Sequence, residues 1–484
     1  MNVAIAGGGP VGLMLACELG LAGVPTTVFE RTAQRSPDAR AWGLHARTVE
    51  TLDRRGLVEA LWHEKAAWPK MPFAGMWPLL DLSALASDHP YILNVPQTRV
   101  EEVLEARARE LGVTILREHD VTGFGQDAHG VVVEVTDSLG AARRLEASYL
   151  VGCDGGRSTV RKLAGIEFAG TDPTVSGMLC DCTLPTMAQE RRGITRTPGG
   201  TVNINPRPNG VVRIVTTEFG RPHSDRDAPV TVEEFRGAVR RVLGRDLDIV
   251  EPTFMTRFGD STRLAGSYRV GRVLLAGDAA HVHFPYGGLG LNLGLQDAVN
   301  LGWKLAAHVR GRASDGLLDS YDAERRPAAA AVLEYSRTQL ALLDPHRNVT
   351  ALRTLFGSLL EIPEVNRYLA EQATGTGLRY GSSEGAHGLV GSFAAEMRLK
   401  TGFGEESLVA LLRSGRGVLL DLAGDGDVAE VGRAWSSRVD MVTATCDGSP
   451  AAAVLVRPDG YVAWAGDGDS ATLPDALRTW FGTP

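Results

Sequence analysis

The residues with the clearest chemical meaning form a glycine-rich turn near the start of the chain, Gly7-Gly8-Gly9-Pro10-Val11-Gly12. The turn follows a short apolar strand-like run, Val3 to Ala6, and opens an apolar helical stretch, Val11 to Ala22. Such a G-x-G-x-x-G turn lets the backbone approach a diphosphate, which then lies at the positive end of the helix dipole. Glu30, at the end of the next predicted strand, is placed to accept hydrogen bonds from ribose hydroxyl groups. The sequence therefore predicts a dinucleotide site.

A second glycine-rich turn lies far downstream, where the apolar run Arg272 to Ala276 meets Gly277-Asp278. The loop Pro285 to Asn292 and a long predicted helix follow. A second helix N-terminus can stabilise negative charge. Nothing in the first thirty residues separates NAD from FAD. A long cofactor whose ring becomes anionic on reduction needs this distant turn, however, whereas NAD does not, so the pattern favours FAD.

Together with Cys153-Asp154-Gly155-Gly156-Arg157-Ser158, these two turns resemble the motifs of the class A flavoprotein monooxygenases, the p-hydroxybenzoate hydroxylase-like aromatic hydroxylases. The similarity covers about residues 1–340. The tail, about 390–484, is similar to the degenerate thioredoxin-like domain of the larger members, which hydroxylate aromatic polyketides or rifamycins. Leu289 stands where many relatives carry glutamine, which predicts a more apolar pocket here.

The resemblance assigns roles to the positions that match the family motifs. It implies that Asp154 helps to hold FAD and to admit the nicotinamide cofactor, and that Asp278 binds the ribityl chain. Each aspartate could instead cap the element that follows it. Leu291 and Asn292 would contact the flavin ring through their backbone. The expected cofactor-binding positions are Gly7, Gly9, Pro10, Val11, Gly12, Glu30, Arg31, Arg47, Gln97, Val121, Asp154, Asp278, Pro285, Gly288, Gly290, Leu291 and Asn292.

Three of these positions, Arg47, Gln97 and Val121, lie far from the glycine turns in the sequence. The resemblance implies that Arg47 faces the flavin, that Gln97 touches FAD and that Val121 contacts the adenine. Arg47 could instead be a solvent-facing charge paired with Glu50, three residues on in the same helix. Gln97 could be ordinary polarity at a strand edge.

No metal site is predicted. His281 and His283 alternate without a further cysteine or carboxylate partner, which favours structural roles. Cys180 and Cys182 form C-x-C rather than C-x-x-C, and alternation in a strand would place both thiols on one buried face. No group is assigned as catalytic acid or base.

The expected fold class is α/β: a Rossmann-like FAD-binding domain of the glutathione-reductase type, an inserted α+β substrate domain and a thioredoxin-like C-terminal domain. We expect the FAD domain at 1–70, 98–170 and 267–375, the substrate domain at 71–97 and 171–266, a linker at 376–389 and the last domain at 390–484. Within the substrate domain, Thr201 to Asn205 and Val211 to Val215 alternate like strands.

Four residues are candidates for contact with the substrate. Arg213 lies in an otherwise apolar strand, so it needs a buried partner, either a substrate oxygen or a structural carboxylate. Arg196 carries the same two interpretations. Tyr286 and Phe73 are candidates for the pocket, with core or lid packing as the alternative.

Composition restricts the class of protein. The 484 residues carry a net charge of −8 and no basic block, which argues against nucleic acid as the partner. There is no apolar run long enough to span a membrane and no secretory signal, so we expect a cytoplasmic protein without a membrane partner. A homodimer is compatible with this picture.

The resemblance implies an FAD-dependent monooxygenase with NADPH as a transient co-substrate and O₂ as the oxidant. It would hydroxylate a bulky aromatic, polyketide-like or ansamycin substrate through a flavin C4a-hydroperoxide. Baeyer–Villiger oxygenation by the same peroxide and a non-redox protein that retains FAD stay open as alternatives. A halogenase is disfavoured because no two of the eight tryptophans stand two apart, and a dithiol flavoreductase because no redox-active cysteine pair occurs.

Overall fold

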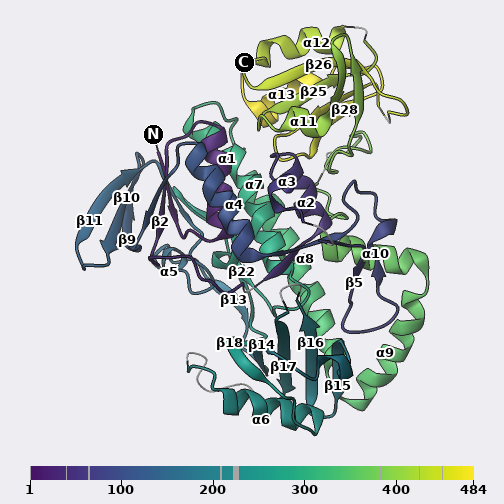
Figure 1. The fold of residues 1–484 in the computed structure, drawn as a ribbon. Coiled ribbons are helices and arrows are strands. Elements are labelled where there is room, and N and C mark those ends of the chain that lie inside the picture. Colours follow the sequence, from purple (N-terminus) through teal and green to yellow (C-terminus); the bar gives the residue numbers. More distant parts are fainter. Residues whose placement is uncertain are drawn as a thin grey trace.

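The computed structural model describes residues 2–39, 41–63, 66–207, 210–221, 228–381, 384–424, 426–449 and 451–484. A six-stranded sheet in the order β20-β21-β12-β1-β2-β8 forms its centre (Figure 1). The strands are Arg269–Val270 (β20), Val273–Leu275 (β21), Tyr149–Gly152 (β12), Val3–Ala6 (β1), Thr26–Glu30 (β2) and Thr114–Arg117 (β8). All neighbouring pairs are parallel except β20 and β21. Parallel sheets need cover on both faces, and β1, β12 and β21 are accordingly buried along their whole length.

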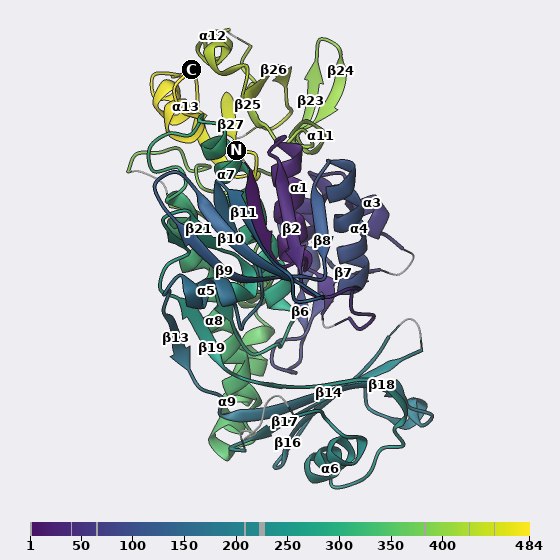
Figure 2. The same ribbon diagram turned by 90° about the vertical axis from the view of Figure 1, so that its left-hand side faces the viewer.

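Different layers cover the two faces of this sheet (Figures 1 and 2). Helices α1 (Pro10–Leu21), α4 (Gln97–Glu110) and α7 (Leu289–Val309) pack against one face. On the other face lies an antiparallel sheet of β9 (His119–Gln126), β10 (Val131–Asp137) and β11 (Ala142–Ala147). The predicted helices after both glycine turns are confirmed, and the arrangement is the expected Rossmann-like FAD-binding fold.

A second layered unit lies below the first in Figure 1. Its antiparallel sheet has the order β15-β16-β17-β14-β18, with α6 against one face. The bounds are Gly193–Thr197 (β15), Gly200–Pro206 (β16), Val212–Phe219 (β17), Val175–Thr183 (β14), Val250–Gly259 (β18) and Val232–Leu243 (α6). The two predicted strands of this region are confirmed as β16 and β17. Cys180 and Cys182 are both buried on β14, as alternation predicted.

Short elements connect these two units. The connecting strands are Trp42–Leu44 (β3), Ala67–Trp68 (β4), Lys70–Met71 (β5), Leu80–Asp81 (β6), Ile92–Pro96 (β7), Phe168–Thr171 (β13), Thr262–Ala265 (β19) and His281–Val282 (β22). The remaining helices before the tail are Ala46–Asp53 (α2), Val58–Leu61 (α3), Thr159–Leu163 (α5), Ser320–Leu343 (α8), Arg347–Leu360 (α9) and Pro363–Thr374 (α10). The exact domain boundaries stay a prediction. β7 lies inside the segment expected in the substrate domain, yet it pairs with β3, which lies in the expected FAD domain.

The tail forms a third unit, drawn in yellow-green at the top of Figure 1. Its mixed sheet has the order β24-β23-β26-β25-β27-β28, and β25 and β26 are its parallel pair. The strands are Arg398–Thr401 (β23), Gly404–Ser407 (β24), Gly417–Asp421 (β25), Val439–Thr445 (β26), Ala453–Val456 (β27) and Val462–Gly466 (β28). The helices are Leu408–Leu412 (α11), Asp427–Gly432 (α12) and Leu473–Phe481 (α13). This is the α/β tail expected of a thioredoxin-like domain.

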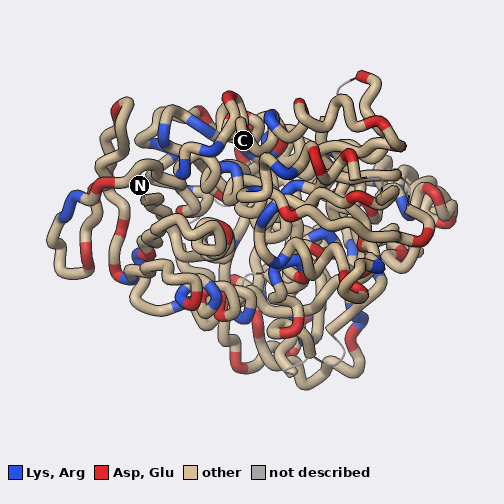
Figure 3. The backbone as a smooth tube through the Cα atoms, turned by 90° about the horizontal axis from the view of Figure 1, so that it is seen from above, with Lys and Arg blue, Asp and Glu red and all other residues tan. Residues whose placement is uncertain are grey.

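Acidic and basic residues are interspersed along the backbone when the molecule is viewed from above (Figure 3). Within the described ranges, no helix has the length and apolar character needed to cross a membrane.

Candidate cofactor and substrate site

The three predicted motifs meet at one edge of the central sheet. Each follows a parallel strand, so backbone bonds hold all three turns at the carboxyl ends of β1, β12 and β21. The Gly7 N–H donates to Phe29 O at 2.8 Å, the Cys153 N–H to Ala6 O at 2.8 Å, and the Ala276 N–H to Gly152 O at 3.0 Å. Ligands of open α/β sheets bind at this edge, so the topology supports the predicted site.

Close packing explains why glycine is needed at these turns. Gly7 has a φ of 106°, and a Cβ there would lie 2.4 Å from Cys153 O. A Cβ on Gly12 would lie 2.0 Å from Gly7 O, and one on Gly277 would lie 2.9 Å from Val11 Cγ2. Gly9 differs, because a Cβ there would meet no heavy atom within 4 Å. The backbone of Gly9 is therefore open to an approaching diphosphate, next to the N-terminus of α1.

Glu30 holds the first turn in place. Its Oε2 accepts the Gly8 N–H at 2.8 Å, and its Oε1 accepts the Thr32 N–H at 2.9 Å. A carboxylate has about four acceptor positions, so acceptor capacity remains for a ribose. Arg31, the next residue, is exposed.

Only one of the two carboxylate oxygens of Asp154 is hydrogen-bonded within the described part of the chain. Its Oδ2 accepts the backbone N–H groups of Thr159 at 2.7 Å and Val160 at 3.1 Å, so it caps α5 as the alternative interpretation predicted. Its Oδ1 is buried, with no hydrogen-bond partner among the described residues. Buried carboxylate oxygens are costly without a donor, so Oδ1 fits a hydroxyl or N–H group of a bound cofactor. The residues present therefore fit FAD at this edge.

The second turn brings Asp278 close to the first turn of α7. Asp278 is exposed in a short 3₁₀ turn, Gly277–Ala279. A Cβ placed on Gly290 would lie 3.9 Å from Asp278 Oδ1. Leu291 is half-buried and Asn292 buried on the same helix, and the loop before it contains Pro285. The predicted carboxylate and the predicted helix N-terminus are thus neighbours.

His45, which the sequence reasoning missed, fixes this loop. Its N–H donates to Asn292 Oδ1 at 2.7 Å, and its ring Nε2 lies 3.0 Å from Gly287 O. Asn292 Nδ2 donates to Gly288 O at 2.9 Å. Gly287 and Gly288 both have positive φ, 77° and 70°, so the loop needs such support. The only signal in the sequence was the position of His45 directly before the helix that carries Arg47.

Burial controls the protonation of His45. The ring is enclosed, and desolvation lowers the pKa of His45 to about 4. The histidine is therefore neutral at neutral pH, and Nε2–H can donate to Gly287 O.

Asp297 supports the Gly277 turn from behind. Its Oδ2 accepts the Gly277 N–H at 3.1 Å and lies 2.7 Å from His281 Nε2. Its Oδ1 accepts from Arg325 Nε at 2.8 Å. Burial opposes ionisation of this carboxyl, but Arg325 and His281 outweigh burial and lower the pKa of Asp297. These contacts agree with a structural role for His281, and the described ranges hold no cluster of metal-ligating residues.

Of Arg47, Gln97 and Val121, the first two have side-chain partners within the protein. Arg47 pairs with Glu50, donates to Thr376 O at 3.1 Å and stacks on the ring of Phe393. The structure therefore favours the ion pair with Glu50, although it is buried rather than facing solvent. Gln97 is the first residue of α4, and its Nε2 donates to Glu101 at 2.8 Å. Val121 is buried in β9, and its contact with adenine stays a prediction.

The two arginines considered for substrate binding are engaged by the protein. Arg213 forms a bidentate pair with Asp181, at 2.7 and 2.6 Å, and donates to Ala39 O at 2.6 Å. Arg196 donates to the carbonyls of Leu343 and Asp344 after α8. The structure favours the structural interpretation of both arginines, because their guanidinium groups donate to protein oxygens, and their contact with a substrate stays a prediction.

Phe73 and Tyr286 belong to one apolar cluster between the central unit and the antiparallel sheet. Phe73 is fully buried, with its ring centroid 5.6 Å from that of Tyr335. Tyr286 stacks with Phe284 at 6.4 Å, and burial raises the pKa of its hydroxyl. The cluster includes Met71, Phe73, Met76, Phe258, Phe284, Tyr286, Tyr335, Leu342 and Phe356. Phe258, Tyr286, Tyr335 and Phe356 are its partly buried aromatic members, whereas Phe73 and Phe284 belong to its buried core.

Two family models together match most of the chain. A family model described as FAD binding domain matches residues 1–336, and one described as aromatic-ring hydroxylase, C-terminal, matches residues 387–484.

Individual relatives are similar over their full length. The chain is 42% identical to rifampicin monooxygenase of Streptomyces venezuelae, covering 99% of this chain and 98% of that protein. It is 41% identical to dialkyldecalin synthase of Streptomyces rugosporus, covering 99% of each. The solved structure of OxyS anhydrotetracycline hydroxylase from Streptomyces rimosus has a TM-score of 0.94 at 45% identity, covering 100% of this chain and 99% of that one.

Proposed function

The chain belongs to the family of FAD-dependent aromatic-ring hydroxylases, and on this premise we propose that it uses NADPH and O₂ to hydroxylate a bulky aromatic substrate. The observation that carries the proposal is the meeting of three motifs at one edge of the sheet. There the backbone of Gly9 is free of neighbouring atoms, and Asp154 Oδ1 has no hydrogen-bond partner among the described residues. When bound, FAD supplies hydride acceptance and oxygen activation. The cytoplasm is the compartment proposed for this reaction.

The chain's own residues would bind and orient the cofactor. We assign the diphosphate to the backbone of Gly9 and the N-terminus of α1, and the ribose to Glu30. Asp154 Oδ1 would accept a hydrogen bond from the cofactor. The N-terminus of α7 would stabilise negative charge on the flavin ring, with Asn292 and His45 holding the loop.

The apolar cluster supports an aromatic substrate. Its partly buried rings, those of Phe258, Tyr286, Tyr335 and Phe356, would stack against a planar polycycle and help to exclude water from the reacting atoms. Leu289, where relatives carry glutamine, is also buried and adds to this apolar character. The names of two relatives include rifampicin and anhydrotetracycline, so we propose an ansamycin or polyketide-like substrate. Baeyer–Villiger oxygenation of a similar substrate uses the same cofactor chemistry and is a further outcome of the test.

A second candidate function is supported by one relative. Dialkyldecalin synthase covers the whole chain, and its name is that of a synthase rather than a monooxygenase. Under this alternative the chain would retain FAD without consuming NADPH.

The test follows NADPH oxidation and O₂ uptake by the FAD-loaded enzyme against a panel of polycyclic phenols and ansamycins, with Gly9→Ala as the matched variant. A Cβ on Gly9 meets no atom, so this variant should fold, yet it would obstruct the diphosphate and bind FAD at least about tenfold more weakly. We expect substrate-stimulated NADPH oxidation and a product heavier by one oxygen atom. Flavin-loaded wild-type enzyme that never oxidises NADPH would favour the non-redox alternative, and equal FAD affinity in Gly9→Ala would overturn the assigned diphosphate site.

A further inference from the structure

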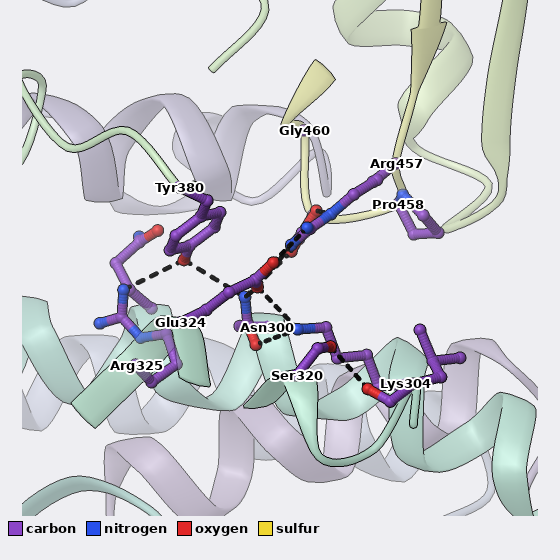
Figure 4. Close-up of polar contacts among 12 residues, drawn as sticks. Asn300, Lys304, Ser320, Glu324, Arg325, Tyr380, Arg457, Pro458 and Gly460 are labelled. Atoms are coloured by element: carbon purple, nitrogen blue, oxygen red, sulfur yellow. Dashed lines mark hydrogen bonds and ion pairs between the residues drawn. The ribbon is translucent and has the colours of Figure 1, made fainter. Parts of the chain in front are cut away.

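A turn of the C-terminal unit packs against the central unit and is buried there. The turn Arg457-Pro458-Asp459-Gly460 joins β27 to β28 and lies against α7 and α8 (Figure 4). The Arg457 and Asp459 side chains are each only 2% exposed. A buried charged turn at a domain contact is unusual, because charged residues are rarely fully buried unless paired.

The charges of this turn are paired across the two units. Arg457 Nη2 donates to Glu324 Oε2, on α8, at 2.9 Å, and its Nε to Asp459 Oδ1 at 2.9 Å. Glu324 also accepts from Lys304 Nζ, on α7, at 2.6 Å. Desolvation lowers the pKa of Lys304 to about 8, while Arg457 and Lys304 outweigh burial and lower that of Glu324 to about 2. Neither partner could leave without stranding a buried charge.

From this cluster, hydrogen bonds continue to the candidate cofactor site. Asn300 Nδ2 donates to Glu324 Oε2 at 2.7 Å and to the Tyr380 hydroxyl at 3.2 Å, and it lies 3.3 Å from Asp459 Oδ2. Arg325 Nη1 donates to the same hydroxyl at 3.2 Å (Figure 4). Arg325 also holds Asp297, whose Oδ2 accepts the Gly277 N–H. The contacts thus run without a break from Asp459 to the turn that carries Asp278.

The rigid, buried surroundings of these contacts favour the transmission of a displacement from the tail to the Gly277–Asp278 turn. Asn300 and Asp297 are both on α7, and Arg325 is on α8. Tyr380 comes from the segment between the units, and its ring lies 4.2 Å from that of Tyr461 on the C-terminal side. Each of these side chains is buried, so a shift at one end cannot be absorbed by solvent.

We propose that Arg457 and Asp459 are positioning residues for the cofactor: through Tyr380, Arg325 and Asp297 they set the place of the Gly277–Asp278 turn. The proposal rests on the proposed function and on the predicted contact of Asp278 with the ribityl chain of FAD. The C-terminal domain would then serve the cofactor site of its own chain, although it contributes no residue to the predicted site itself.

The test removes one atom from the path. Tyr380→Phe keeps the ring against Tyr461 but deletes the hydroxyl that Asn300 and Arg325 share. Asp459→Asn is a second variant of the same path. Ser314→Ala is the control, because the Ser314 hydroxyl donates to Thr479 O across the same contact between units but lies outside the path.

Two readouts are taken on each FAD-loaded protein: the dissociation constant for FAD by flavin fluorescence, and hydrogen exchange of the peptide containing Gly277. We expect both path variants to raise the dissociation constant about threefold to tenfold and to speed exchange at Gly277, with Ser314→Ala like wild type. If Tyr380→Phe and Asp459→Asn match the control in both readouts, the proposal is overturned while the FAD site stands. If wild-type protein binds no FAD, the proposed function fails first, and with it the premise.

Discussion

A single buried residue, His45, supports the loop before α7. It is buried and neutral, and it donates to the carbonyl of Gly287 in a loop whose glycines have positive φ. A charged imidazolium in the same place would be desolvated without a carboxylate among its hydrogen-bond partners.

The pKa of His45 predicts an acid-sensitive stability. The unfolded state takes up a proton near the ordinary pKa of 6.5, whereas the folded state resists protonation until about 4. The stability that depends on neutral His45 is therefore complete above pH 6.5 and is lost as the pH falls towards 4. By about pH 5 the loss should be about 2 kcal/mol. Urea unfolding of wild type and His45→Gln at several pH values measures it, and parallel pH curves for the two proteins would contradict the prediction.

Single residues were predictable from the sequence where their partners are near in the chain or their motif is compact. Asp154 and the glycines of both turns were found in this way. His45 and Asp297 were missed, because their partners Gly287 and Arg325 become neighbours only in the folded chain. Arg47 had a predicted ion pair within its helix, but its contact with Phe393 depends on the approach of the tail.

At the scale of elements, the antiparallel sheet carries an ion pair between adjacent strands. Asp181 on β14 lies directly opposite Arg213 on β17 in the register, and the two side chains form a bidentate pair. The Arg213 side chain is 5% exposed and that of Asp181 15%. A pair this enclosed is costly to break from one side.

Breaking that pair should affect stability rather than substrate binding. Arg213→Met strands the Asp181 carboxylate, so we expect the free energy of unfolding to fall by about 3 kcal/mol or more. The double variant Arg213→Met/Asp181→Asn should recover much of the loss, because it removes the unpaired charge. Urea unfolding measures both, and a raised KM with unchanged stability would instead return Arg213 to the substrate site.

Elements with a clear local period were predicted well. The strands β1, β16 and β17 and the helices α1 and α7 follow from alternation or apolar runs next to turns. The pairing of β7 with β3 was not predictable, because register between short distant strands depends on tertiary contacts. The helices α9 and α10 lie in the last segment of the expected FAD domain, where the sequence predicts no individual helix after α7.

The whole molecule is joined by buried charges as well as by chain connectivity. Besides the Arg457 contacts, Arg55 donates to Glu18 on α1 at 2.6 Å and to Pro458 O at 2.8 Å. Arg54 donates to Gly460 O at 3.1 Å. Domains of one chain commonly move relative to one another, whereas these contacts hold buried charges of one unit against the other.

These buried contacts predict that the tail does not unfold separately from the rest of the chain. We expect differential scanning calorimetry of the full chain to show one cooperative transition, because unfolding the tail alone would take Arg457 away from Glu324. It would also remove the Pro458 and Gly460 carbonyls that accept from Arg55 and Arg54. Arg457→Met should lower the temperature of that single transition by several degrees. Two resolved transitions in wild-type protein would show that the units are independent.

The order of the strands has a consequence for synthesis. β1 pairs with β2 and with β12, but the other edge of β12, which ends at Gly152, waits for β21 at Val273–Leu275. The nascent chain therefore has an unpaired edge on β12 while the antiparallel sheet of β14 to β18 is being translated. Sheets closed by such distant strands fold slowly and are prone to mispairing. The turn Arg457–Gly460 is translated long after α7 and α8, so Glu324 and Lys304 lack the charge of Arg457 until the tail has been made.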